Sequence, residues 1–148
     1  MALGLCLNCD MIVAEEGTKF QITETSRGLP GSWYWALLKY RGAESLAMDA
    51  ALTGRFFTAE EAFAAKAVDR LAPAGEGLNT ARELAATINR NPPLGTRATV
   101  RSRRWFMEKL ESEVALYYRS LNLTLTEDFA EATRAFVEKR PPGAFKGR

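Results

Sequence analysis

The fold of this chain is decided by Asp10-Met11-Ile12-Val13-Ala14-Glu15-Glu16-Gly17-Thr18-Lys19-Phe20-Gln21-Ile22-Thr23-Glu24 and the corner Arg27-Gly28-Leu29-Pro30-Gly31 that follows it. Residues 11–14 and 19–22 carry β-branched or aromatic side chains on either side of a turn at Gly17, which predicts two short strands. Glu24, 14 positions after Asp10, falls in an irregular turn between the second strand and the corner. In such a turn the backbone fixes the position of the Glu24 carboxylate, and a general acid or base needs a fixed position.

Helices and one further strand are predicted around this stretch. Residues 2–9 are nearly all apolar or small, which is typical of a helix buried on all sides. Ser32 is predicted to cap a helix over 33–41 that stops at Gly42, and a second helix follows over 43–52. Thr58-x-x-Glu61 is a capping box that opens a helix over about 59–66, and residues 68–71 are predicted to form a strand.

The second half of the chain is predicted to be helical. Apolar residues at helical spacing run from Leu78 to Ile88, and Pro92-Pro93 breaks that helix and starts another that runs to about Leu110. Residues 111–123 and 127–138 give two more helices, and the Pro-Pro-Gly tail has no regular structure. We therefore expect an α/β part over residues 1–72 and a helical region over residues 73–148.

Composition restricts the classes of function. A length of 148 residues fits one domain, and 20 basic against 18 acidic residues gives a net charge of +2. The basic residues of the helix after Pro93 could form a phosphate or nucleic-acid face, but nearby glutamates favour a solvated face, so no nucleic-acid partner is predicted. No apolar run is long enough to span a membrane, and no secretion signal is visible, which predicts a cytoplasmic protein with no membrane partner.

The absence of histidine excludes Ser-His and Cys-His catalysis within this chain and leaves no imidazole for zinc. Cys6-x-x-Cys9 could be a redox pair, or two small buried residues one turn apart on an apolar helix. The second interpretation is favoured because no strand precedes the pair. No metal site is predicted.

Six motifs in order resemble the enoyl-CoA hydratase/isomerase (crotonase) family, over essentially the whole chain. They are the stretch quoted above, Leu52-Thr53-Gly54-Arg55, Thr58-Ala59-Glu60-Glu61-Ala62, Ala67-Val68-Asp69-Arg70-Leu71, Asn91-Pro92-Pro93-Leu94, and Glu138-Lys139-Arg140-Pro141-Pro142 through Phe145-Lys146-Gly147-Arg148. The resemblance is to the C-terminal portion only, so an N-terminally truncated chain is expected. It implies an α/β crotonase-like (ClpP/crotonase) spiral remnant followed by a helical C-terminal trimerisation module.

The resemblance also implies the chemistry. Glu24 matches the glutamate that moves protons at the carbon next to a thioester, in enoyl-CoA isomerase or hydratase reactions through an enolate. From the residues alone, Glu24 could instead merely pair with Arg27. Gly4 stands where hydratases carry a second glutamate. Because a single carboxylate suffices for isomerisation, the resemblance favours isomerisation over hydration without excluding hydration. The substrate is an acyl-CoA thioester, with coenzyme A as part of the substrate and no separate cofactor.

Further substrate-binding residues follow from the same resemblance. Met1 falls at a glycine whose N–H forms half of the oxyanion hole. The Leu29-Pro30-Gly31 corner belongs to the catalytic end of the pocket, and Trp33 either narrows the acyl pocket or packs in the core. Phe145 and Lys146 match residues near the adenine and phosphates of coenzyme A, often across a subunit boundary, in a trimer or dimer of trimers. The alternative is a non-catalytic truncated homologue that acts only in assembly.

Overall fold

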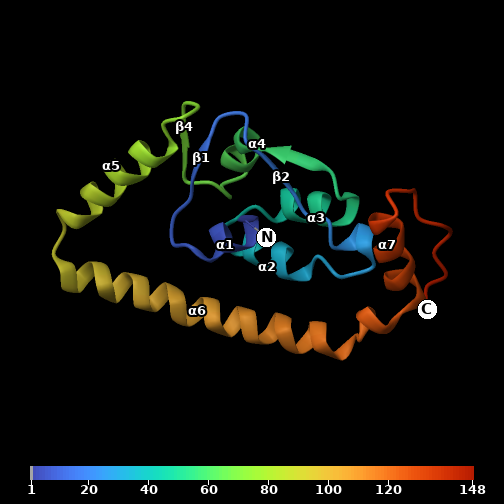
Figure 1. Ribbon diagram of the computed structural model, residues 1–148. Helices are drawn as coiled ribbons and strands as arrows, with labels where there is room; N and C mark the ends of the chain where they lie inside the picture. The colour runs from blue at the N-terminus through green and yellow to red at the C-terminus, as the bar shows by residue number, and fades with distance from the viewer. Residues whose placement is uncertain (1) are drawn as a thin grey trace.

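The computed structural model describes residues 2–148, so Met1 and the oxyanion position predicted for it lie outside the described part (Figure 1). The chain folds as a small α/β core beside an extended helical region. All the described strands lie between residues 13 and 72, and the helices after them form a long arm that runs past the core and returns to it at the C-terminal end.

The strands pair with partners far along the sequence. β1 (Val13–Glu15) pairs in parallel with β4 (Arg70–Ala72), and β2 (Lys19–Gln21) pairs antiparallel with β3 (Phe56–Thr58). The two predicted strands on either side of Gly17 are present but do not pair with each other, and β3 was not predicted. Phe20 lies opposite Phe57 in the β2–β3 register, with ring centroids 5.5 Å apart.

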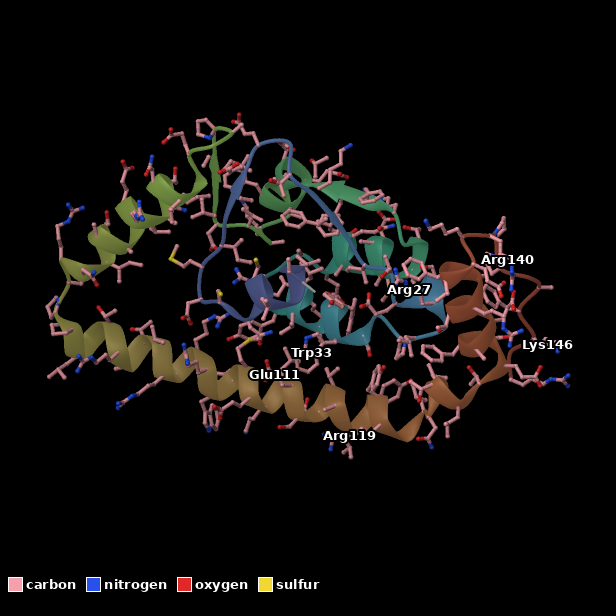
Figure 2. All side chains as sticks on the ribbon, in the orientation of Figure 1. Arg27, Trp33, Glu111, Arg119, Arg140 and Lys146 are labelled. Atoms are coloured by element: carbon pink, nitrogen blue, oxygen red, sulfur yellow. The ribbon has the colours of Figure 1, made fainter. Side chains whose placement is uncertain are left out.

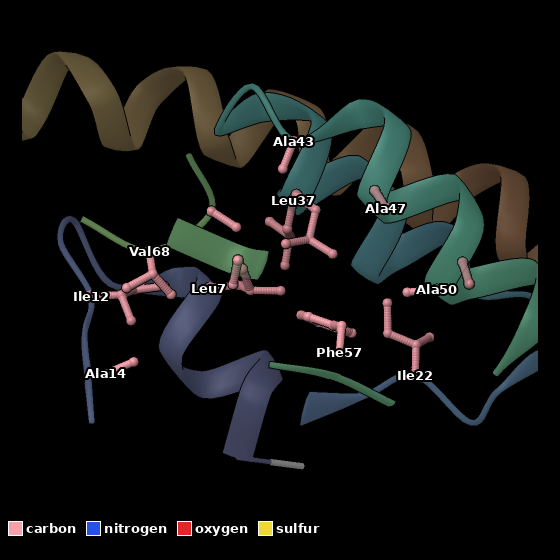
Figure 3. Close-up of a cluster of buried hydrophobic side chains, with 14 of the residues drawn as sticks. Leu7, Ile12, Ala14, Ile22, Leu37, Ala43, Ala47, Ala50, Phe57 and Val68 are labelled. Atoms are coloured by element: carbon pink, nitrogen blue, oxygen red, sulfur yellow. The ribbon is translucent and has the colours of Figure 1, made fainter. Parts of the chain in front are cut away.

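Four helices pack with these strands around one apolar cluster: α1 (Ala2–Asn8), α2 (Ser32–Tyr40), α3 (Glu44–Thr53) and α4 (Ala59–Ala64). Leu7, Ile22, Leu37, Leu38 and Phe57 are its largest fully buried side chains, and α3 contributes alanines (Figure 3). The predicted capping box of Thr58 and Glu61 is confirmed at the start of α4.

Two local predictions at the N-terminal half were wrong. α1 is not buried on all sides, since Leu7 is its one buried residue, and Leu5 and Cys9 are exposed. This helix meets the core with one face only. Ser32 is not the cap of α2 either, because that helix begins at Ser32 itself and Gly31 is the capping residue, without a side-chain bond.

The helical region is dominated by one long helix. α5 (Gly77–Asn89) ends before the two prolines, and α6 (Pro93–Ser120) then continues for 28 residues. The predicted break near residue 110 was wrong, because no glycine or proline occurs between Gly95 and the end of α6. None of the helices within residues 2–148 combines the length and the apolar character needed to cross a membrane.

Two contacts fix the middle of α6 to the core. Met107 is buried in the apolar cluster. The Arg103 guanidinium pairs with the Asp10 carboxylate at 3.2 Å and donates to the carbonyl of Cys9 at 3.0 Å. Asp10 and Cys9 therefore hold the long helix at the point where α1 ends.

The chain returns to the core through η2 (Leu123–Leu125) and α7 (Glu127–Val137), which packs on the short helix η1 (Thr25–Arg27). Gly28 makes this contact possible: its φ is +75°, and a Cβ there would come within 3.1 Å of the Phe129 backbone. Arg27 stacks on the ring of Phe136, 4.2 Å from its centroid. Thus α7 covers the turn that follows Glu24.

We expect Gly28→Ala to destabilise the protein more than Gly17→Ala does. Both glycines have a positive φ, +75° and +76°, so both substitutions cost about 1–2 kcal/mol of backbone strain. Only Gly28 would also force α7 away, since a Cβ at Gly17 meets nothing within 4 Å, and this adds about 1–3 kcal/mol. Urea unfolding of both variants measures the difference, and equal losses of stability would contradict the α7 contact.

Candidate active site

Backbone hydrogen bonds hold Glu24 in place. Its carbonyl accepts the N–H groups of Arg27 and Leu29, both at 2.9 Å, which closes the short helix η1 onto Glu24. The side chain is half-buried, two residues after the fully buried Ile22. The sequence analysis left open that Glu24 only pairs with Arg27. Within residues 2–148 no ion pair joins these two side chains, and the Arg27 guanidinium lies on the ring of Phe136 instead.

Tyr34 lies near Glu24 in the folded chain. Burial raises the pKa of the Tyr34 phenol above its ordinary value of 10.0, and the nearby negative charge of Glu24 raises it further. The phenol is therefore protonated at neutral pH.

Gly4 opens the space beside this pair. A Cβ built at Gly4 would lie 3.5 Å from the Tyr34 hydroxyl and 3.6 Å from the nearest carbon of its ring. α1, the turn before η1 and the first turn of α2 thus bring Gly4, Glu24 and Tyr34 together. Gly4 and Glu24 were predicted as site residues, whereas Tyr34 was not, because its nearness to Glu24 depends on how α2 lies against α1.

The Leu29-Pro30-Gly31 corner connects Glu24 to α2. The Leu29 N–H bonds to the Glu24 carbonyl, and Gly31 is the buried capping residue of α2. A Cβ at Gly31 would come within 3.0 Å of Ala51 in α3, so only glycine allows this approach without a shift. Trp33 is half-buried against the apolar cluster.

The C-terminal residues do not converge with Glu24 in this chain. The Lys146 ammonium bonds to Glu127 at 2.8 Å, and its backbone N–H donates to Asp128 at 2.7 Å. Phe145 is half-exposed. Figure 2 places Lys146 at the outer edge of the molecule beyond α7, well away from Trp33 on α2. Roles for Phe145 and Lys146 in binding coenzyme A stay predictions.

Comparison with known proteins now identifies the fold and the family. The family model described as enoyl-CoA hydratase/isomerase matches residues 2–148. The chain belongs to the enoyl-CoA hydratase/isomerase family. A putative enoyl-CoA hydratase of Thermus thermophilus is 34% identical over 142 residues, with 94% of this chain and 56% of that protein covered. The 2,3-dehydroadipyl-CoA hydratase of Escherichia coli is also 34% identical, over 147 residues, with coverage of 97% and 57%.

The solved structures agree with the crotonase-like fold predicted from the motifs. A carnitinyl-CoA hydratase from Mycobacterium avium superposes with a TM-score of 0.82 at 28% identity, covering 97% of this chain and 57% of that one. The chain therefore spans little more than half the length of the relatives that it matches. It shares their fold over nearly all of its own length.

A large groove separates the α5–α6 arm from the core of this family member. It has a volume of about 1180 Å³ and lies between β1, α5 and α6. Its lining is mainly apolar and includes Met11, Leu84, Ile88 and Val100, with Asp10 and Glu15 among the polar residues. The groove does not contain Glu24 and so is separate from the candidate site.

Acidic side chains hold the C-terminal tail, residues 140–148, against α7. We therefore expect this contact to be sensitive to acid. Glu131 binds the guanidinium of Arg140 at 2.6 Å and the N–H of Gly143 at 2.8 Å. Hydrogen bonds from Arg140 and Gly143 lower the pKa of Glu131 from 4.5 to about 2. Since the folded-state pKa is depressed, this contribution to stability is present above pH 4.5 and is lost as the pH falls through about 2.

We expect Glu131→Gln to be less stable than the unmodified chain near neutral pH, and the difference to vanish as the pH falls from 4.5 towards 2. Denaturant unfolding across this range measures the difference. Glu138→Gln is the matched control. Glu138 also pairs with Arg140, at 2.7 Å, but the Gly143 N–H bonds to Glu131. A constant difference between Glu131→Gln and the unmodified chain at all pH values would contradict the assignment.

Proposed function

We propose that this chain is part of an acyl-CoA-processing enzyme that works through a thioester enolate, as an enoyl-CoA isomerase or hydratase. The family and the setting of Glu24 support this proposal. Glu24 is the proton-transfer residue, held by backbone and not by a surface ion pair. The substrate is an acyl-CoA thioester, and coenzyme A enters as part of it without a separate cofactor. We place the reaction in the cytoplasm.

The chemistry requires a base and a site that stabilises the enolate oxygen. Glu24 removes a proton from the carbon next to the thioester, and the negative charge moves to the thioester oxygen, where N–H donors must stabilise it. We assign one of these donors to the Met1 position, as the family resemblance implies, and the second to residues outside this chain. Gly31 and the Leu29-Pro30 corner hold the turn that carries Glu24.

Isomerisation is the favoured reaction because it needs one carboxylate. The single base takes a proton from one carbon and returns it to another, whereas adding water requires a second group to activate the water. Gly4 supplies no side chain, and the raised pKa of its neighbour Tyr34 keeps that phenol protonated at neutral pH, so it is not available as a base. We therefore expect 3-enoyl-CoA to be converted to 2-enoyl-CoA faster than 2-enoyl-CoA is hydrated.

The second candidate is a non-catalytic homologue that acts only in assembly. It is favoured by one observation: the chain spans little more than half the length of its relatives. Loss of one oxyanion donor typically lowers a rate by about 10²–10³-fold, so an incomplete oxyanion hole would leave little turnover.

Glu24→Gln should lower turnover by about 10²–10⁴-fold, the usual contribution of a general base. The protein is expressed from its complete natural reading frame, including any in-frame upstream sequence, and 3-enoyl-CoA and 2-enoyl-CoA are followed separately. Glu16→Gln is the matched control, since Glu16 is an exposed carboxylate on the same segment. Near-normal turnover of Glu24→Gln would remove Glu24 from the mechanism, and no turnover of the unmodified protein would favour the assembly role.

We also propose that the protein is a homo-oligomer, most simply a trimer, formed through the region after residue 77. α6 exposes large apolar side chains: Leu94, Trp105, Phe106, Leu116 and Tyr117. Such exposed groups on one long helix are typical of an interface.

Light scattering after size exclusion should give a mass near three times 16.4 kDa. Leu116→Glu should reduce this mass, because Leu116 is 75% exposed and would be covered by the partner. Leu52→Glu, at a 65% exposed leucine of α3, should leave the mass unchanged. A species of 16.4 kDa at micromolar concentration would contradict the proposal.

A further inference from the structure

We infer that Arg103 is a positioning residue for α1: it ties the long helix α6 to the short helix that follows the assigned oxyanion donor. The inference rests on the proposed function for its chemical consequence. The anchoring of α1 by Arg103 is a property of the folded chain, however, and can be measured without any turnover.

Two guanidinium groups from other helices meet at the C-terminal end of α1. The carbonyl of Cys9 accepts a hydrogen bond from Arg103 of α6 at 3.0 Å, and a second from Arg41, which directly follows α2. A carbonyl oxygen has two lone pairs, so these two bonds use its full capacity. α6 and α2 are thus joined at the residue that directly follows α1.

This positive charge matters because α1 has none of its own. The C-terminal end of a helix carries a partial negative charge, and α1 has no basic residue in its last turn. Asp10, just beyond the helix, adds a full negative charge at the same end. The Arg103 guanidinium lies 3.2 Å from the Asp10 carboxylate, so one side chain offsets both charges.

Few buried side chains hold α1 by other means. The helix has seven residues, which makes it a rod of about 10 Å, and Leu7 is its one buried residue. Leu3 and Cys6 are only partly buried against the apolar cluster. The position of α1 therefore depends on the hydrogen bonds at its C-terminal end more than that of a well-packed helix would.

The two arginines differ in what their removal would do. The Arg41 side chain is only 7% exposed and also binds Asp69 at 3.1 Å, and the same carboxylate accepts the Ile12 N–H at 2.7 Å. Loss of Arg41 would leave this partly buried charge without its partner and would destabilise the core. The Arg103 side chain is 20% exposed and lies at the edge of the core. Arg103 is therefore the anchor that can be removed while the core stays folded.

The position of α1 affects the proposed reaction because different elements carry the oxyanion donor and the base. The donor is assigned to the Met1 position, directly before α1, whereas Glu24 lies on the turn before η1. Gly4 of α1 also lies beside Tyr34 of α2, so a shift of α1 changes this contact as well. A misplacement of about 1 Å caused by a distant substitution can lower a rate by about 100-fold. Arg103 acts on the reaction through α1 and touches no reacting atom.

The alternative is that Arg103 only fixes α6 to the core through its ion pair with Asp10. Asp10→Asn distinguishes the two interpretations, because it removes the charge of that partner and leaves the bond from Arg103 to the Cys9 carbonyl. Arg103→Gln removes both contacts of the guanidinium. Arg104→Gln is the matched control, since Arg104 is an exposed arginine of the same helix.

The first arm of the experiment measures amide hydrogen exchange in the protein expressed from its complete natural reading frame. We expect Arg103→Gln to speed exchange in the last turn of α1 by about 10–100-fold, the loss expected for one hydrogen bond to a charged group. Exchange in α3, whose alanines are buried in the core, should stay as in the unmodified protein. Asp10→Asn should speed the exchange of α1 far less, and Arg104→Gln should leave it unchanged.

Three results of this arm would overturn the anchoring. The first is equal exchange of α1 in Arg103→Gln and Arg104→Gln. The second is an equal rise in α1 and α3, because it marks a loss of global stability and not a local release of α1. The third is an equal effect of Asp10→Asn and Arg103→Gln, which would assign the anchoring to the ion pair and not to the Cys9 carbonyl.

The second arm follows the conversion of 3-enoyl-CoA by the same variants, at a temperature at which all of them remain folded. Arg103→Gln should lower kcat by about 10–100-fold with KM little changed, because a displaced α1 weakens stabilisation of the transition state and not substrate binding. Asp10→Asn should keep most of the kcat of the unmodified protein, and Arg104→Gln should keep all of it.

The outcomes separate this inference from the proposed function. Faster exchange of α1 together with a lower kcat in Arg103→Gln supports the positioning role. Faster exchange with an unchanged kcat shows that the reaction does not need α1 to be held, and overturns the role. Faster exchange with no turnover of the unmodified protein overturns the proposed reaction and the positioning role that depends on it, while the anchoring of α1 by Arg103 stands.

Discussion

The close approach of α2 and α3 is the constraint on which the site depends. Small residues allow it: Gly31 faces Ala51, and Ala47 and Ala50 are fully buried. Helices whose facing side chains are this small can bring their backbones together, and any added volume would force them apart. Because α2 starts at this contact, the corner before it and the turn that carries Glu24 are fixed by the same packing.

This packing also explains how a site can be built from short elements. The described strands have three residues each, and η1 is a single turn, so none of them could hold a functional side chain alone. The α2–α3 pair fixes one side of the turn, and α7 covers it from the other through Gly28. The turn that carries Glu24 is therefore held by helices on two sides.

The sequence predicts the parts of this molecule that are local. The Thr58–Glu61 capping box, the helix stop at the two prolines and the motifs of the family depend on residues within a few positions of one another. The pairing of β1 with β4 joins residues 57 positions apart, and no local pattern encodes it. Tyr34 was missed for the same reason: Glu24 and Gly4 were found through the family resemblance, whereas Tyr34 comes near Glu24 only when α2 packs in the folded chain.

The long arm has a consequence for how the molecule opens. α5 has no buried residue, and among the α6 residues whose burial the structure describes only Met107 is buried, so little apolar surface is exposed when this arm separates from the core. Regions with few buried contacts open with much less free energy than global unfolding requires. Amide hydrogen exchange should therefore divide the chain into a slowly exchanging unit around α2 and α3 and a rapidly exchanging one around α5, with the Arg103–Asp10 ion pair near the boundary.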